Sequence, residues 1–368
     1  MSLRRFAGLA ILLTASMLSI GQGWAESWQH TVSSQFSTEF DSNPAMSPTY
    51  SEGVWRALFE PSYTLTGRLG ENELKTGLAL QIARSSNKTL SPDRDSPTVF
   101  FDWLHPINAG ELGISSRYAE VATRDAGIDS TGLARVPSTR VSRTVSGRWN
   151  KALTERSTLS ADGSYEGVSY SDSSYVNYAT RTVSTMFSYA WSESSTPFFK
   201  VSNADYEPTG GGPSSRLSTA VLGLNWIASD YLEGSLQIGK SKVSDAEMGT
   251  QGGASVHYTG QRSVIILSAN RQVSPSGLGG FSTVDQANGS WSNALSERSR
   301  TGIDIGWQQN HLFTNIINRT ASTWLQYELN SFWNVRTYYT HRITEQSGGG
   351  VAFSNILGIA LVYTNPNF

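Results

Sequence analysis

The stretch from Leu217 to Lys240 shows the pattern of apolar and polar positions that recurs along the chain. Apolar residues alternate with small or polar residues from 220 to 226, and the alternation resumes from 232 to 239 after a turn at Ser229 and Asp230. A period of two predicts β-strands, so we expect an antiparallel hairpin with one apolar face. A soluble antiparallel sheet carries the same pattern, so the rest of the chain must decide between the two.

We predict about 18 strands of this kind, with 16 as the alternative, because strand boundaries read from one sequence shift by a few residues. The glycine-rich residues 249–253 are predicted as a loop, and the strand after them is short. The predicted strands are 28–39, 54–69, 73–84, 99–104, 111–121, 141–149, 157–170, 178–191, 197–206, the two strands of the 217–240 hairpin, 255–259, 264–270, 286–295, 301–308, 323–329, 333–342 and 353–363.

The predicted connections alternate in length. Short turns follow the even-numbered strands, and long loops follow the odd-numbered ones. Bacterial outer-membrane barrels have this asymmetry, with short periplasmic turns and longer extracellular loops. The sequence therefore predicts an all-β fold: a transmembrane antiparallel β-barrel that spans residues 26–368 as one domain.

The amino-terminal residues have the pattern of a secretory signal peptide. Arg4 and Arg5 precede an apolar run over 6–20, and the small residues Gly23 and Ala25 favour cleavage after Ala25. We therefore predict a signal peptide over 1–25 and a location in the cell outer membrane. The apolar run is shorter than the roughly 20 residues that a spanning helix needs, and no later stretch comes near that length without a polar residue. We therefore expect no transmembrane helix in the mature chain.

Composition also favours a barrel over a soluble domain. Only 16% of the 368 residues are charged, below the usual share of about 25%. Ser and Thr suit strands whose second face meets a water-filled lumen. The chain has no cysteine, which excludes disulfide bonds and thiolate chemistry. A formal net charge of -2 does not suggest a nucleic-acid partner, because such proteins usually carry a basic patch.

Aromatic residues test the predicted topology independently of the strand count. One set lies just before the short turns, where it would form an interfacial girdle, and two tryptophans lie at the opposite rim. The alternative, a soluble β-solenoid or sandwich, explains the alternation but not this shared depth. The first rim has Trp103, Trp149, Trp191, Trp226, Tyr258 and Trp291, and the opposite rim has Trp55 and Trp307.

The face opposite the apolar residues is where we expect function. Its polar residues carry charges of both signs, whereas one sign predominates in a strongly ion-selective pore. Such a lumen suits a hydrated carbohydrate. For any single residue, the alternative of solvating the wall or pairing across strands is the commoner role. The predicted lumen-facing residues are Lys75, Gln81, Asp102, Glu111, Arg117, Asn225, Glu233, Gln237, Asp304, Gln326, Glu328, Asn334, Arg336, Tyr338 and Arg342.

Motifs for catalysis or metal binding are not supported. Residues 234–241 (GSLQIGKS) match the phosphate-loop pattern, but that loop needs a helix after it, and here the motif is itself part of a strand. The five histidines lack metal-binding spacing, and there is no G-x-S-x-G motif. We therefore predict no enzyme activity, catalytic residue, metal or cofactor. A hydrolase assembled from separate strands stays an alternative.

Residues 40–44 (FDSNP), residues 271–277 (RQVSPSG) and the series of strands resemble the outer-membrane β-barrel family associated with exopolysaccharide gene clusters. The resemblance covers the whole mature chain and implies a channel through which a secreted polysaccharide crosses the outer membrane. One departure is at the carboxyl terminus. Barrels of this kind finish a strand on a terminal aromatic residue, but here residues 365–367 (NPN) interrupt the alternation before Phe368.

The first functional hypothesis is therefore passive export of a polysaccharide through a polar lumen. The second is a diffusion porin for small solutes or oligosaccharides, which differs in whether a narrowing loop folds inside the barrel. A barrel-embedded hydrolase and a structural or adhesin role are further alternatives. The expected partners are outer-membrane lipid and a polysaccharide or oligosaccharide, with periplasmic export components if the first hypothesis holds.

Overall fold

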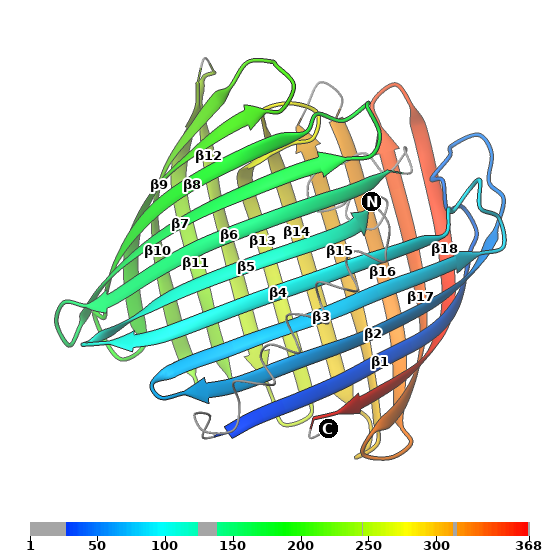
Figure 1. Ribbon diagram of the computed structural model, residues 1–368, viewed down its shortest axis with the longest axis horizontal. Helices are drawn as coiled ribbons and strands as arrows, with labels where there is room; N and C mark the ends of the chain where they lie inside the picture. Colours follow the sequence, from blue (N-terminus) through cyan, green and yellow to red (C-terminus); the bar gives the residue numbers. More distant parts are fainter. Residues whose placement is uncertain (1–26, 124–137, 245, 312–314, 367–368) are drawn as a thin grey trace.

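The computed structural model describes residues 27–123, 138–244, 246–311 and 315–366. They form a single antiparallel sheet of 18 strands that closes on itself (Figure 1). The predicted fold class is confirmed, and of the two predicted strand numbers, 18 is right. Within these residues, none of the helices has the length and apolar character needed to span a membrane. The predicted signal peptide lies outside the described residues.

The first six strands are β1 (Ser27–Asp41), β2 (Val54–Leu69), β3 (Asn72–Ser85), β4 (Arg94–Ile107), β5 (Gly110–Ala122) and β6 (Thr139–Ala152). The next six are β7 (Ser157–Tyr170), β8 (Tyr178–Tyr189), β9 (Ser195–Pro208), β10 (Ser215–Ser229), β11 (Leu232–Val243) and β12 (Met248–Thr259). The last six are β13 (Ser263–Pro275), β14 (Phe281–Ala294), β15 (Ser299–His311), β16 (Asn315–Glu328), β17 (Trp333–Gln346) and β18 (Gly350–Asn365).

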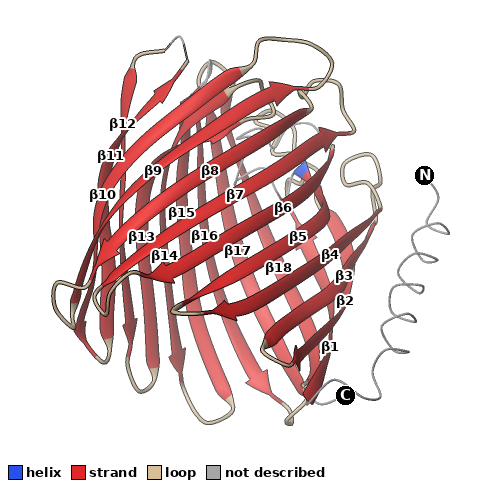
Figure 2. Ribbon diagram, turned by 60° about the vertical axis from the view of Figure 1, so that its left-hand side comes forward, coloured by secondary structure: helices blue, strands red, loops and turns tan. Residues whose placement is uncertain are grey.

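The barrel closes through β1 and β18, which pair antiparallel from Val32 with Asn365 to Asp41 with Ile356 (Figure 2). Each strand thus has a hydrogen-bonded neighbour on both sides, and no sheet edge is left open. A wall that satisfies its own backbone polar groups is a requirement for strands that cross a bilayer.

The two faces of the wall differ in chemistry. Large apolar side chains are exposed on the outer face, among them Phe36 (53%), Leu222 (61%) and Ile238 (71%). The inner face is concave, so side chains there reach over a neighbouring strand: Tyr338 of β17 crosses β18 and bonds Glu39 of β1. An apolar outer band around a polar interior is the arrangement of an outer-membrane barrel, and it places this chain in the outer membrane.

Several strand pairs place an aromatic ring directly over a glycine of the neighbouring strand. A Cβ atom at any of these glycines would collide with the ring, so the pair fits in only one register. Aromatic residues that cover glycines are a known means of fixing sheet register. The pairs are Gly67 with Trp28, Gly77 with Phe100, Gly223 with Phe198, Gly234 with Trp226, Gly302 with Trp324 and Gly358 with Tyr338.

Many predicted strands were too short at the loop end. The predicted loop 249–253 is part of β12, and β4 and β16 begin at Arg94 and Asn315 rather than at 99 and 323. These strand ends carry polar residues on both faces, so the alternation stops before the hydrogen-bonded ladder does. At its opposite end, β18 continues past the predicted limit of 363 to Asn365. The phosphate-loop match lies wholly within β11, which agrees with its dismissal.

The predicted alternation of connection lengths holds only for the first part of the chain. Long loops cover 42–53, 86–93 and 123–138, of which 124–137 lie outside the described residues. The later connections 244–247, 276–280, 312–314 and 347–349 are as short as the turns at the other end. The prediction of long loops in this part of the chain was wrong because it assigned the polar ends of the strands to the loops.

Candidate functional site

All of the predicted lumen-facing residues lie on the inner face. Residues paired across neighbouring strands point to the same face, and successive residues along a strand alternate between the two faces. Because the pairing is continuous around the barrel, the inward position of Tyr338 fixes the face of every other strand residue. Whether any of them contacts a solute stays a prediction. Those residues are Lys75, Gln81, Asp102, Glu111, Arg117, Asn225, Glu233, Gln237, Asp304, Gln326, Glu328, Asn334, Arg336, Tyr338 and Arg342.

Two of these residues meet through a tryptophan that the prediction missed. Trp324 of β16 donates its indole N–H to Asp304 at 3.0 Å, and the guanidinium of Arg336 lies 4.4 Å from the centre of its ring. The ring therefore connects an anion to a cation across β15, β16 and β17. The alternation could have located Trp324, because its neighbours Thr323 and Leu325 both face outward.

Tyr338 belongs to a buried network beside β1. Its hydroxyl donates to Glu39 at 2.7 Å, and Nε of Arg56 donates to the same carboxylate at 2.7 Å. Glu39 and Arg56 are both buried. A buried carboxylate needs such partners because its charge has lost water. These two residues were not predicted, since each looks like an ordinary polar position in an alternating strand.

Further along the wall, Glu60 accepts hydrogen bonds from two amides. Gln81 donates at 2.6 Å and Gln35 at 3.1 Å, so the three side chains join β1, β2 and β3. Other predicted residues also have cross-strand partners: Glu233 contacts His257 at 3.0 Å, and Glu111 contacts Arg148 at 3.6 Å. Charges of both signs therefore line the lumen and pair with each other, as one of the two interpretations predicts.

The β1–β2 loop folds into the barrel mouth. Asn43 donates to the backbone carbonyls of Ser47 and Phe353 at 2.9 and 3.0 Å, and Met46 is buried with a positive φ of 46°. The loop covers inner-face residues of β16, β17 and β18, and encloses with them a small cavity of about 20 Å³. Arg342 lines this cavity, and its Nε is buried without a hydrogen-bond partner.

A second inward structure joins loops that are far apart in the sequence. The amide of Val176, in the β7–β8 loop, donates to the carbonyl of Gly277, in the β13–β14 loop, at 2.7 Å. The hydroxyl of Tyr206, near the end of β9, donates to the Ser276 carbonyl at 3.3 Å. We call these two loops and the tyrosines beneath them the tyrosine bridge. Since β9 to β12 lie between its two ends, the bridge crosses the mouth as a chord.

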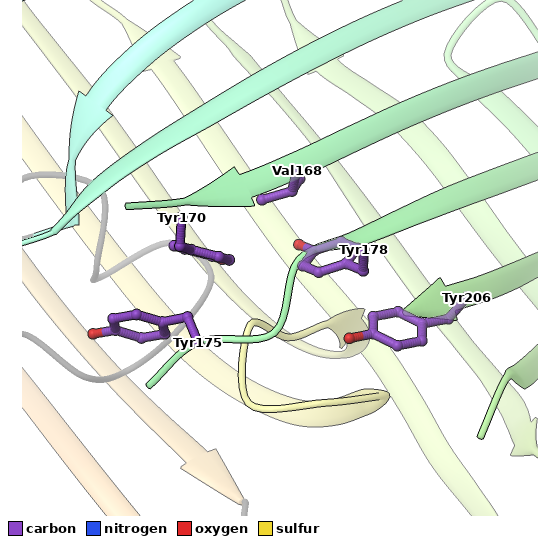
Figure 3. Packing of buried hydrophobic residues seen from close by; sticks show 5 residues of the cluster. All are labelled: Val168, Tyr170, Tyr175, Tyr178 and Tyr206. Carbon is purple, nitrogen blue, oxygen red and sulfur yellow. The ribbon is translucent and has the colours of Figure 1, made fainter. Parts of the chain in front are cut away.

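Figure 3 shows the tyrosine rings of the bridge in a row along the ends of β7, β8 and β9. Tyr170 stacks on Tyr175 with ring centres 4.8 Å apart, and Tyr178 stacks on Tyr206 at 4.9 Å. Phe281 closes the row against Tyr206 at 5.9 Å. These rings bury a large apolar area, which explains why loops with few backbone bonds stay folded inward.

Titratable groups of the β7–β8 loop fit this arrangement. Burial raises the pKa of the Tyr175 phenol to about 12, so the ring is neutral at ordinary pH. The Ser174 hydroxyl and amide lower the pKa of Asp172. The Asp172 carboxylate accepts from that amide at 2.8 Å, which holds the turn ahead of Tyr175.

Near the bridge, the inner face encloses a polar cavity of about 480 Å³. Thr180 is buried and its hydroxyl has no hydrogen-bond partner, and the same holds for the buried Oδ1 of Asn270. Lys200 is exposed, and no ion pair or hydrogen bond is found for it among the described residues. Of the predicted residues, only Gln237 lines this cavity. The lining comes from strands β6 to β14, so sequence spacing could not have assembled it.

The predicted interfacial aromatics lie where the strands meet the rims. Trp103 donates to Asn72 at 3.0 Å beside the short β2–β3 turn, and Trp191 lies in the β8–β9 turn with 74% of its surface exposed. Tyr258 and Trp291 both pair with Ile265, one from each side. Trp149 and Trp226 occupy outer positions near the ends of β6 and β10, while Trp55 and Trp307 lie towards the opposite rim. Their depth in a bilayer stays a prediction.

Metal binding has no site in the part of the chain that the structure describes, where no group of three or more His, Cys, Asp or Glu side chains could hold an ion. The lumen instead offers hydroxyls, amides and paired charges. Such groups can bind and orient a solute.

The fold of this chain is similar to that of solved outer-membrane proteins, at low sequence identity. No family model matches the chain, and no curated protein matches it. The crystal structure of the outer membrane protein OpdK from Pseudomonas aeruginosa matches with a TM-score of 0.51 and 10% identity, over 93% of this chain and 100% of that one. OpdK with vanillate gives 0.52 and 9%, and P. aeruginosa OccK2 (OpdF) with glucuronate gives 0.51 and 11%, each over 93% of this chain and all of the other.

Proposed function

We propose that this protein is an outer-membrane diffusion channel for small, hydroxyl-bearing solutes. The observation that carries this proposal is the tyrosine bridge, which narrows the mouth on one side while the β1–β2 loop narrows it on the other. A loop that folds inside the barrel is the feature that separates a small-solute porin from an open export channel. Barrels of this strand number otherwise have a wide aqueous lumen.

The cavity near the bridge suits such a solute. Its volume of about 480 Å³ lies within the roughly 300–1,000 Å³ of sites for small molecules. The exposed side chains that line it include the Gln237 amide, which can donate and accept, and the Lys200 cation. Phe281 provides apolar surface for the carbon face of a ring. Weak binding of this kind lets the solute leave again.

The comparisons support a small solute rather than a polymer. OpdK was crystallised with vanillate and OccK2 with glucuronate, both of which are small molecules. Polysaccharide export stays a prediction that depends on the sequence resemblance. A polymer would have to pass beside the bridge or displace it, and no contact among the described residues favours that path.

Liposome swelling with neutral sugars of increasing size tests the proposal. We expect monosaccharides and disaccharides to enter, and larger oligosaccharides to be excluded. Tyr206→Ala, which removes the ring and hydroxyl that hold the bridge, should raise the size limit. Tyr165→Ala is the matched control, because Tyr165 lies on the outer face and is 47% exposed. Exclusion of monosaccharides, or equal entry of sugars of every size, would contradict the proposal.

A further inference from the structure

Cross-strand ion pairs mark one rim of the outer face, at the end of the barrel that carries the long loops. Long loops are extracellular in outer-membrane barrels. All of the ion pairs lie near the ends of their strands that lead into the loops, and their side chains point outward. Ion pairs fit water or the lipid head-group layer, and not the hydrocarbon below. The pairs are Arg84–Asp95 (2.8 Å), Arg181–Glu207 (3.0 Å), Arg216–Asp205 (2.6 Å), Arg319–Glu345 (2.5 Å) and Arg271–Asp285 (3.1 Å). His311 is hydrogen-bonded to the same Asp285 at 2.7 Å.

Lys240 and Lys242 on β11 break this pattern. Both are exposed on the outer face, and neither forms an ion pair with another described residue. Lys240 is opposite Thr250 on β12, and Arg271 is opposite Gly252 on the same strand. The Cα atoms of Lys240 and Arg271 are thus two strand spacings apart across the sheet, about 10 Å, and two residues apart along it, about 7 Å. Only a threonine and a glycine lie between them, so an anion can approach both.

Below Arg271, on the side of β12 away from the two lysines, runs an apolar groove with a volume of about 430 Å³. Along β12 and β13 the next outward residues are Ala254 and Ala269, and Ala287 and Gly289 continue the floor on β14. Leu267, Ile305 and Trp307 form its taller walls. The small floor residues make a channel that begins two residues below Arg271 and runs towards the middle of the wall.

We propose that this face binds a phosphorylated, acylated lipid of the outer leaflet. The phosphate lies between Lys240, Lys242 and Arg271, and one acyl chain lies in the groove over Ala254 and Ala269. The order of features along the strands matches such a lipid, with cations at the head-group level and apolar surface below. Lys240 and Lys242, two cations without an ion pair to a described residue, lie next to a chain-sized groove and favour this occupant over a second copy of the protein, which would present no phosphate to them. Arg271, which is paired with Asp285, adds a third cation.

Native mass spectrometry of the detergent-purified full-length protein, titrated with diphosphoryl lipid A, tests this proposal. The variant K240A/K242A/R271A should bind on the order of a hundredfold more weakly, since each cation near such a head group contributes roughly fivefold. The control R84A/R181A/R319A removes three rim cations elsewhere and should bind normally. Ala269→Phe should also weaken binding, because it fills the groove without changing any charge.

Three results would overturn the proposal. An equal loss of lipid binding in both triple variants would show general charge attraction. Equal binding of lipid A without phosphates would show that the cations do not recognise the phosphorylated head group. Lipid-free dimers cross-linked through Ala269→Cys would assign the groove to a second copy. Inorganic phosphate alone should not bind. Circular dichroism and heat-modified gel mobility establish that each variant is folded, and all the substituted side chains are on the outer surface.

Discussion

At the scale of single residues, Gly358 shows how one position organises the inner wall. The Tyr338 ring lies across Gly358 and so reaches Glu39 two strands away. Arg56 completes the buried network on the other side of that carboxylate. The absence of a side chain at 358 is therefore what allows this contact to cross β18.

We predict that Gly358→Ala destabilises the barrel by about 1–3 kcal/mol, because the added methyl group would overlap the Tyr338 ring and overpack the wall. Urea unfolding in lipid vesicles measures the effect. Gly163→Ala is the control, since a Cβ there has open space within 4 Å. Equal stability of the two variants would mean that the ring has room to move.

At the scale of loops and strands, ionisation of the Tyr175 phenol should make the stability of the tyrosine bridge depend on pH. Its pKa is raised from 10.0 to about 12, so its contribution to folding is full below pH 10 and is lost as the pH rises through 12. We predict that absorbance at alkaline pH shows a late phase of tyrosine ionisation to which Tyr175 contributes, and that faster proteolysis of the β7–β8 loop accompanies the ionisation of Tyr175. Tyr175→Phe should remove that pH dependence. A tyrosine titration with no late phase would contradict the burial.

The faces of a strand can be tested with a matched pair in one hairpin. Leu224 faces outward and Gln237 inward, by the register of β10 and β11. We predict that Leu224→Arg costs about 2–4 kcal/mol and impairs assembly, because the charge enters lipid, whereas Gln237→Arg leaves the barrel folded. Refolding yield into vesicles measures both. Equal yields would contradict the assigned faces.

The sequence predicts those elements that a local pattern of apolar and polar residues determines. Alternation around Leu224 predicted the strands, their faces and the closed barrel, because one lipid-facing side imposes a period of two. It failed over 249–253, where glycines carry no polarity signal. The bridge was beyond prediction, because the six strands β8 to β13 separate Val176 from Gly277 along the chain, and the two residues meet only in the folded barrel. Thr180 and Asn270 likewise come together only in space.

At the scale of the whole molecule, an 18-strand barrel has a wall for lipid and an interior for water, and its loops decide what passes. The tyrosine bridge and the β1–β2 loop both enter the mouth, from different parts of the wall. Small side chains on the outer face near β12 and β13 leave room for lipid as well. Solute passage and lipid binding are thus assigned to opposite faces of the same strands.

Single-channel conductance in a planar bilayer tests the central claim most directly. The account predicts discrete steps that a disaccharide blocks briefly, and larger steps with shorter blocks for Tyr206→Ala, which loosens the bridge beside the cavity. Tyr165→Ala should behave as the unmodified protein does. Steps that only a long polysaccharide blocks would instead support polymer export. Conductance that is absent from both the unmodified protein and Tyr206→Ala would contradict a channel of either kind.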